Sequence, residues 1–73
     1  MARLRNSVLI KKISLKVKRL REERNLTQEE FYNDTGIHIG RIESTNHNIT
    51  VSTLDSICQY FGISLTQFFK ELN

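Results

Sequence analysis

The sequence of 73 residues contains no proline, no tryptophan, one cysteine and three glycines. Because glycine and proline most often interrupt regular structure, their scarcity favours helices over many short strands. Cys58 has no second cysteine to pair with, and His38 and His47 are too few to complete a zinc site with it, so neither a disulfide nor a metal is expected. A reducing, cytoplasmic environment suits such a chain best.

Long apolar runs and catalytic groupings are also missing. The basic start of the chain leads into residues 8–10, but Lys11 and Lys12 end this apolar run far below the length of a signal peptide, and no segment is long enough to span a membrane. Paired carboxylates, Ser/His/Asp sets, Cys/His pairs and phosphate-binding glycine loops are not recognisable. We therefore expect no enzyme, no cofactor, no small-molecule ligand and no membrane partner.

The acidic residues are unevenly placed, which leaves one part of the chain strongly basic. Nine of the eleven lysines and arginines lie in the first 24 residues, opposed there only by Glu22 and Glu23, whereas residues 25–73 hold two basic and six acidic residues. A local basic excess attracts a polyanion such as nucleic acid. A solvated helix face would have the same composition, so charge alone leaves both interpretations open.

The length allows one hydrophobic core, so we expect a basic arm over residues 1–8 and a single domain over residues 9–73. The first helix should end near Asn25, a residue that tolerates the left-handed conformation. Leu15 lies off its apolar stripe and either covers a neighbouring surface or indicates packing on a second side. The stripe itself has helical spacing and consists of Ile10, Ile13, Val17 and Leu20.

A second helix is signalled by its N-terminal capping residues. The hydroxyl of Thr27 can accept from the amide of Glu30 while the carboxylate of Glu30 accepts from the amide of Thr27, which is a capping box. Leu26 can pack on Phe31 and so fix how the chain enters this helix. Turn-forming residues at 33–36 then separate it from residues 37–43, so the order is helix, turn, helix.

Two more helices are expected after a polar loop at residues 44–50. Thr50 can cap the fourth helix, Gly62 can end it, and Ser64 can cap the fifth. Apolar residues recur at i, i+3, i+4 and i+7 in both helices, as Leu54, Ile57, Cys58 and Phe61 and as Leu65, Phe68, Phe69 and Leu72. The predicted fold class is all-α, a compact domain of five helices.

The segment Leu26-Thr27-Gln28-Glu29-Glu30-Phe31 closely resembles the Cro/repressor-like (XRE-type) helix-turn-helix family, to which the lambdoid phage repressors belong. The resemblance continues through residues 20–24, 39–43, 51–54 and 61–65 and covers about four fifths of the chain. It implies a lambda-repressor-like domain that binds double-stranded DNA sequence-specifically and regulates transcription. It also implies a structural ion pair between Arg21 and Glu43 that ties the first helix to the third.

The chain departs from the family pattern in the recognition helix. Six residues separate Gly36 from Glu43, about three fewer than the family usually has, and the missing segment normally carries the first turn of that helix, whose residues usually read bases. Two alignments fit. Either Gly36-Ile37 forms the turn and the third helix starts near His38, or Asn33 forms the turn and Thr35 caps the helix.

Three single residues also differ from the family. Tyr32 stands where a small residue is usual, Thr45 where glycine is usual and Ile49 where proline is usual. These differences affect the local geometry more than the fold.

In a helix-turn-helix the second helix lies in the major groove, so its polar face should contact DNA. Arg41 can donate two hydrogen bonds to a guanine and is the best candidate for reading a base, with a phosphate contact as the alternative. Gln28 lies at a helix N-terminus, where a phosphate is favoured. His38 either contacts a base edge or caps the third helix. The full set of expected DNA-binding residues is Thr27, Gln28, His38, Arg41, Ser44, Thr45 and Asn46.

A domain this small contacts too few bases for useful selectivity, so a homodimer on a palindromic operator is expected. Phe68, Phe69 and Leu72 offer more apolar surface than one short helix needs, and we predict that they form the dimer contact; alternatively all three complete the core. The rival function is an interaction or dimerisation adaptor of the antitoxin type, in which the shortened recognition region reads DNA weakly or not at all.

Overall fold

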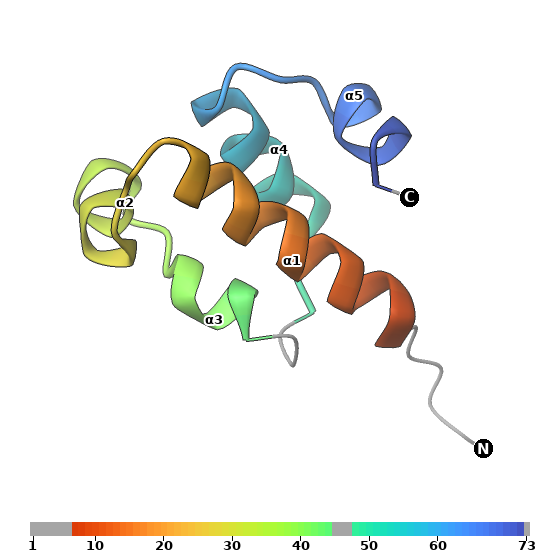
Figure 1. Cartoon of the computed structure of the whole chain (residues 1–73), viewed down its shortest axis with the longest axis horizontal. Helices are drawn as coiled ribbons and strands as arrows, with labels where there is room; N and C mark the ends of the chain where they lie inside the picture. Colours follow the sequence, from red (N-terminus) through yellow and green to blue (C-terminus); the bar gives the residue numbers. More distant parts are fainter. Residues whose placement is uncertain (1–6, 45–47, 73) are drawn as a thin grey trace.

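The computed structural model describes residues 7–44 and 48–72. This part of the chain is entirely helical apart from turns and loops, which confirms the all-α prediction, and none of its helices is long and apolar enough to cross a membrane. The five helices, shown in Figure 1, are α1 (Ser7–Glu23), α2 (Gln28–Thr35), α3 (Ile39–Glu43), α4 (Val51–Tyr60) and α5 (Leu65–Lys70).

The first helix starts earlier than expected. α1 begins at Ser7, so Ser7 and Val8 are helical and do not belong to the arm predicted for residues 1–8. Residues 1–6, the rest of that arm, lie outside the described part. The predicted stripe is buried at Ile10, Ile13 and Val17, whereas Leu15 is 54% exposed. Leu15 therefore faces solvent and α1 packs on one side only.

The first helix ends close to Asn25, as predicted. Asn25 has φ of 56°, the left-handed conformation that ends the helix. The capping box follows, because the amide of Glu30 donates to Thr27 Oγ1 at 3.0 Å and the amide of Thr27 donates to Glu30 Oε1 at 2.8 Å. These two bonds satisfy amides that the start of α2 would otherwise leave without partners.

The turn between α2 and α3 is centred on Gly36, which settles the choice between the two alignments. Gly36 has φ of 74° and its amide donates to the carbonyl of Tyr32 at 2.7 Å, so it terminates α2 in the left-handed conformation. Thr35 is the last residue of α2 and not the cap of α3: its hydroxyl donates to the carbonyl of Phe31 and accepts from the amide of Ile37. The third helix starts just after His38, as the first alignment has it.

The last two helices are capped as the sequence predicts. Thr50 accepts from the amide of Thr53 at 3.1 Å, and Ser64 accepts from the amide of Gln67 at 3.0 Å. Gly62, with φ of 74°, provides the left-handed residue between α4 and α5. Side-chain hydroxyls therefore define the start of both helices.

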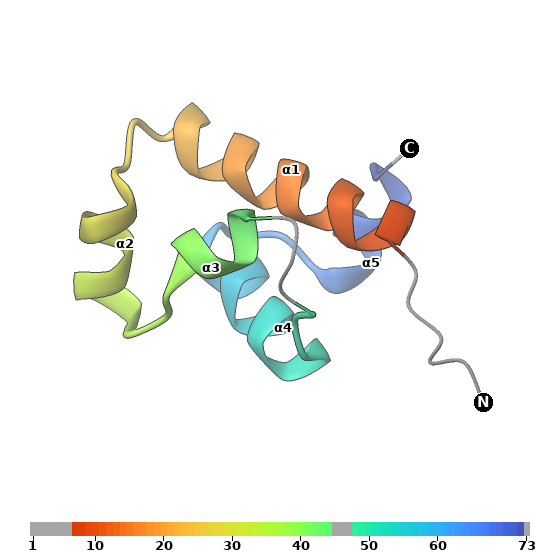
Figure 2. The ribbon, with the colours of Figure 1, turned by 90° about the horizontal axis from the view of Figure 1, so that it is seen from below.

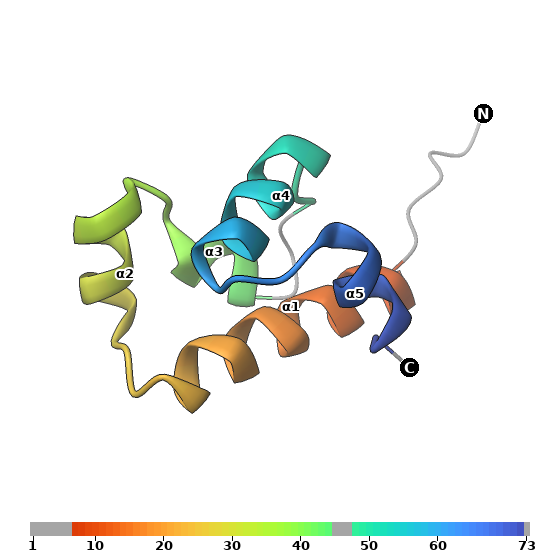
Figure 3. The same ribbon diagram turned by 90° about the horizontal axis from the view of Figure 1, so that it is seen from above.

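The core lies where the helices converge. Seen from below in Figure 2, α1 runs along one side of the molecule with α3 and α4 beside it, and Figure 3 shows α5 lying against the N-terminal half of α1. Phe31 is the central aromatic residue, with Tyr60 edge-on at 4.8 Å and Phe61 stacked at 5.7 Å between ring centres. Phe68 is fully buried in the same core. One of the three residues predicted to form a dimer contact is thus a core residue.

Candidate nucleic-acid interface

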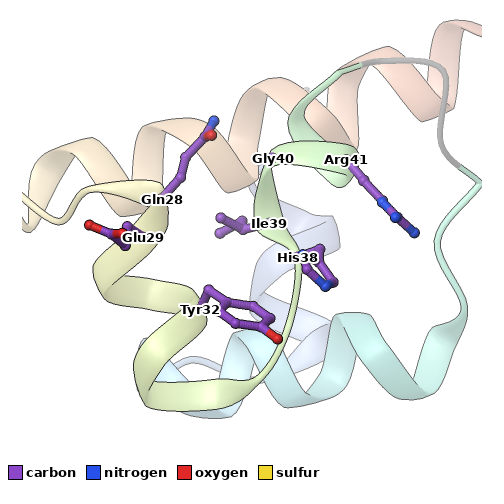
Figure 4. Close-up of a pocket in the computed structure, with 7 residues that line it drawn as sticks. All are labelled: Gln28, Glu29, Tyr32, His38, Ile39, Gly40 and Arg41. Atoms are coloured by element: carbon purple, nitrogen blue, oxygen red, sulfur yellow. The ribbon is translucent and has the colours of Figure 1, made fainter.

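The short turn holds α2 and α3 against each other around an open hollow on the protein surface. Figure 4 shows how side chains from both helices surround it. Three of the predicted DNA-binding residues lie together here, because the hollow is lined by Gln28, Glu29 and Tyr32 from α2, His38 from the turn, and Ile39, Gly40 and Arg41 from α3.

The position of α3 is fixed by the implied ion pair, which the structure contains. Arg21 Nε lies 2.7 Å from Glu43 Oε2 and Nη2 lies 3.0 Å from Oε1, while Nη1 donates to the carbonyl of Leu26 at 2.6 Å. The side chains are only 11% and 4% exposed. The hydrogen bond to Glu43 raises the pKa of Arg21 above its usual value. The guanidinium thereby joins α1, the start of α2 and the end of α3.

Gln28 has a structural partner that the sequence did not indicate. Its Nε2 donates to Glu43 Oε1 at 3.0 Å, and its Oε1 would lie 2.9 Å from a Cβ added to Gly40. The side chain therefore crosses from α2 to α3 in the space that the missing Cβ leaves open. To contact a phosphate by its side chain, Gln28 would have to exchange this bond for a new one.

Arg41 points into solvent. It is exposed, and among the described residues its guanidinium has no hydrogen-bond or ion-pair partner. Ile39 and Ile42 on the same helix are buried, with 1% and 3% of their surface exposed. The apolar side of α3 thus packs inward while Arg41 extends away from the helix, as Figure 4 shows. All five donors of the guanidinium are available to an anion or a base edge.

His38 occupies the position just before α3, but its side chain makes no cap hydrogen bond. Of the two alternatives for His38, a base contact or a cap, the structure therefore contradicts the side-chain cap. Its ring instead lies against that of Tyr32, with centres 4.4 Å apart and planes inclined by 31°. Sequence reasoning did not select Tyr32 as a site residue, although its size at a position where a small residue is usual was the available signal.

The other predicted contact residues lie at helix ends. Thr27 is exposed and its oxygen is engaged in the capping box. Ser44, also exposed, donates to the carbonyl of Arg41 at 2.6 Å and so closes the end of α3. Thr45 and Asn46 lie outside the described residues. Neither Thr27 nor Ser44 lines the hollow.

Some of the basic side chains in the first 24 residues contact other groups of the same protein. Besides Arg21, Lys16 Nζ lies 3.3 Å from Glu71 Oε1, and Arg24 Nη2 donates to the carbonyl of Phe61 at 2.7 Å. The guanidinium of Arg24 also lies 5.3 Å from the centre of the Phe61 ring. A count of basic residues therefore overestimates the charge that α1 offers to a polyanion.

Cys58 is fully buried, and burial raises the pKa of its thiol. A buried, protonated thiol is a poor nucleophile. No group of three histidine, cysteine or acidic side chains suited to a metal ion occurs within residues 7–44 and 48–72.

Comparisons with known proteins agree with this geometry. A family model described as a helix-turn-helix domain matches residues 16–72. Among solved structures, the chain is similar to the restriction-modification controller protein C.Esp1396I, whose crystal structure is that of a tetramer in complex with its natural 35 base-pair operator. The two are 30% identical, the TM-score is 0.78, and 92% of each chain is covered. No curated protein matches. The chain belongs to the Cro/repressor-like (XRE-type) helix-turn-helix family.

Proposed function

We propose that this protein is a transcriptional regulator that binds double-stranded DNA sequence-specifically, as a homodimer on a palindromic operator. The observation that carries the proposal is the exposed guanidinium of Arg41, which has no partner among the described residues and lies on a helix whose other side is packed into the core. In a helix-turn-helix this face enters the major groove. A bidentate contact from Arg41 to guanine is worth roughly 1 to 3 kcal/mol of discrimination between bases.

Supporting contacts come from the residues around Arg41. At the exposed N-terminus of α2 the capping box engages the amides of Thr27 and Glu30, which leaves the amide of Gln28 for a phosphate. Ser44 with the neighbouring Thr45 and Asn46 provides polar groups for the DNA backbone. The controller protein to which the chain is similar binds operator DNA as a tetramer. That likeness favours an assembly of more than one chain here as well.

The dimer contact is proposed for Phe69 and Leu72, without Phe68. Phe69 is 43% exposed on α5, and Leu72 is partly buried at the edge of the core. Burying the remaining surface of Phe69 against a second chain would remove apolar area from water. Gel filtration with light scattering measures the assembly directly, and a monomer at high concentration would remove the homodimer from the proposal.

A titration against DNA tests the function. The protein is titrated with random DNA and with sequences selected from a random library, each at several salt concentrations, alongside Arg41→Ala and the matched surface variant Arg19→Ala. We expect a sequence preference that Arg41→Ala reduces and Arg19→Ala leaves in place, and a general weakening with salt. Equal affinity for selected and random DNA would contradict sequence-specific regulation.

The adaptor of the antitoxin type remains the second candidate because α3 has only five residues. A helix this short presents few side chains to a groove. Absence of DNA binding even at low salt would favour the adaptor, whereas salt-sensitive binding with a sequence preference would exclude it as the main function.

A further inference from the structure

The rings of Tyr32 and His38 form a surface feature that the ion pair, the caps and the core do not explain. Tyr32 lies on α2 and is 42% exposed, although it is a large aromatic residue. Its ring lies 4.4 Å from that of His38, which is also exposed, and both rings line the hollow that Arg41 borders (Figure 4). An aromatic pair is thus presented to solvent beside the free guanidinium.

The shortness of α3 explains why these rings are accessible. α3 begins at the buried Ile39, three residues after Gly36, so only Ile37 and His38 lie between the end of α2 and the start of α3. A helix that began earlier would cover the face of α2 from which Tyr32 projects. Here the tyrosine ring and the histidine ring occupy that side of the hollow.

We infer that Tyr32 is a base-reading residue whose ring, held against His38, contacts the 5-methyl group of a thymine next to the base that Arg41 contacts. This inference rests on the proposed function. It assigns to α2 a part of the sequence recognition that the five-residue α3 is too short to supply alone.

The chemistry of the pair favours a thymine methyl over other groups on the duplex. Thymine is the only base that presents a methyl group in the major groove, and apolar side chains are the ones that read it. The face of a phenol ring has no donor for a phosphate or a guanine. Contact with His38 also restricts the ring before DNA arrives, which lowers the entropy lost on binding.

The test uses the full-length protein and the operator selected from the random library. Each thymine of one half-site is replaced in turn by deoxyuridine, which lacks only the 5-methyl group. Affinities are measured for the wild type, Tyr32→Ala, Tyr32→Phe and the exposed control variant Leu15→Ala, with circular dichroism to establish that each variant is folded. Tyr32→Phe retains the ring and loses only the hydroxyl.

In the wild type, replacement of one particular thymine by deoxyuridine should weaken operator binding. The expected loss of affinity is about fourfold, which corresponds to the burial of one methyl group. Tyr32→Phe and Leu15→Ala should keep this ratio. Tyr32→Ala should bind the original operator more weakly and show no further loss with deoxyuridine. The ratio between the two operators is independent of how much folded protein each preparation contains, so partial unfolding of Tyr32→Ala does not obscure the result.

Three outcomes would overturn the inference. A wild type that binds every deoxyuridine operator as tightly as the original makes no methyl contact that affects affinity. A deoxyuridine penalty that persists in Tyr32→Ala belongs to another residue. A loss of the penalty in Tyr32→Phe would assign the effect to the hydroxyl. In all three cases operator binding persists and the proposed function stands, whereas failure to select any operator would overturn both.

Discussion

The guanidinium of Arg21 and the carboxylate of Glu43 face each other in a bidentate ion pair, with N–O distances of 2.7 and 3.0 Å. The pair joins the last turn of α1 to the last residue of α3, across 22 positions of sequence. Gln28 of α2 donates to the same carboxylate. One acidic side chain therefore sets the positions of the three helices that form the candidate interface.

Removing only the carboxylate should be costly. Glu43→Leu leaves Arg21, whose side chain is 11% exposed, charged and without its partner, and we expect the free energy of unfolding to fall by about 3 to 5 kcal/mol. The double variant Arg21→Met/Glu43→Leu should recover part of this loss, because no buried charge remains unpaired. Urea denaturation measures both, and a double variant less stable than Glu43→Leu would contradict this explanation.

The Arg19–Glu23 pair serves as the control for this comparison. Its atoms are 3.5 Å apart, but the side chains are 70% and 62% exposed. Because solvent screens such a pair, Glu23→Gln should change the stability by less than about 1 kcal/mol.

Local chemistry at helix ends was enough to predict most of the fold. Thr27 with Glu30, Thr50 and Ser64 each act through bonds to amides three residues away, so their effect depends little on the rest of the molecule. The five helices and their order followed from these caps and from the apolar spacing.

Long-range contacts limited the prediction of the site. Nothing near Gln28 in the sequence indicates that its amide reaches Glu43, and nothing near Phe68 distinguishes it from Phe69, yet one ring is fully buried and the other 43% exposed. Both outcomes depend on where other helices lie. The Arg21–Glu43 pair itself was expected only through the family resemblance.

Gly40 and Gln28 should be energetically coupled. In the wild type, Gly40→Ala places a Cβ against Gln28 Oε1 and displaces the amide from Glu43. The loss of this bond, about 0.5 to 1.5 kcal/mol, should roughly cancel the gain in helix propensity of about 0.5 to 1 kcal/mol. In a Gln28→Ala background only the gain remains, so Gly40→Ala should be stabilising there. Denaturation of the four proteins tests this, and an equal effect in both backgrounds would show that the two residues are independent.

Arg41→Lys should separate base reading from phosphate binding. A lysine keeps the charge but cannot donate in the planar bidentate geometry that matches guanine. If Arg41 reads a base, the variant should lose roughly 1 to 3 kcal/mol of discrimination at one base pair of each half-site and keep the salt dependence of binding. Affinities for single-base operator variants at two salt concentrations provide the measurement. Unchanged discrimination at every position would assign Arg41 to a phosphate.

Phe68 and Phe69 should respond differently to truncation although they are adjacent. Phe68→Ala opens a cavity in the core and should destabilise the fold by about 3 to 5 kcal/mol, enough to unfold a domain of this size. Phe69→Ala should leave the monomer folded and weaken self-association. Thermal unfolding and light scattering distinguish the two effects. A Phe69→Ala protein that dimerises as tightly as the wild type would exclude this residue from the dimer contact.

Acid should loosen the attachment of α5 to α1. Hydrogen bonds from Gln67 and Lys16 lower the pKa of Glu71 below its ordinary value of 4.5. Since the folded protein favours the ionised carboxylate, this group stabilises the fold above that value, and the contribution is lost as the pH falls through the lowered pKa. As the pH is lowered from neutral, the midpoint temperature of thermal unfolding should therefore fall less steeply in Glu71→Gln than in the wild type. The effect should be small because the side chain of Glu71 is 51% exposed. Carboxyl NMR titration of Glu71 gives the independent measurement, and an ordinary pKa there would remove the basis for the prediction.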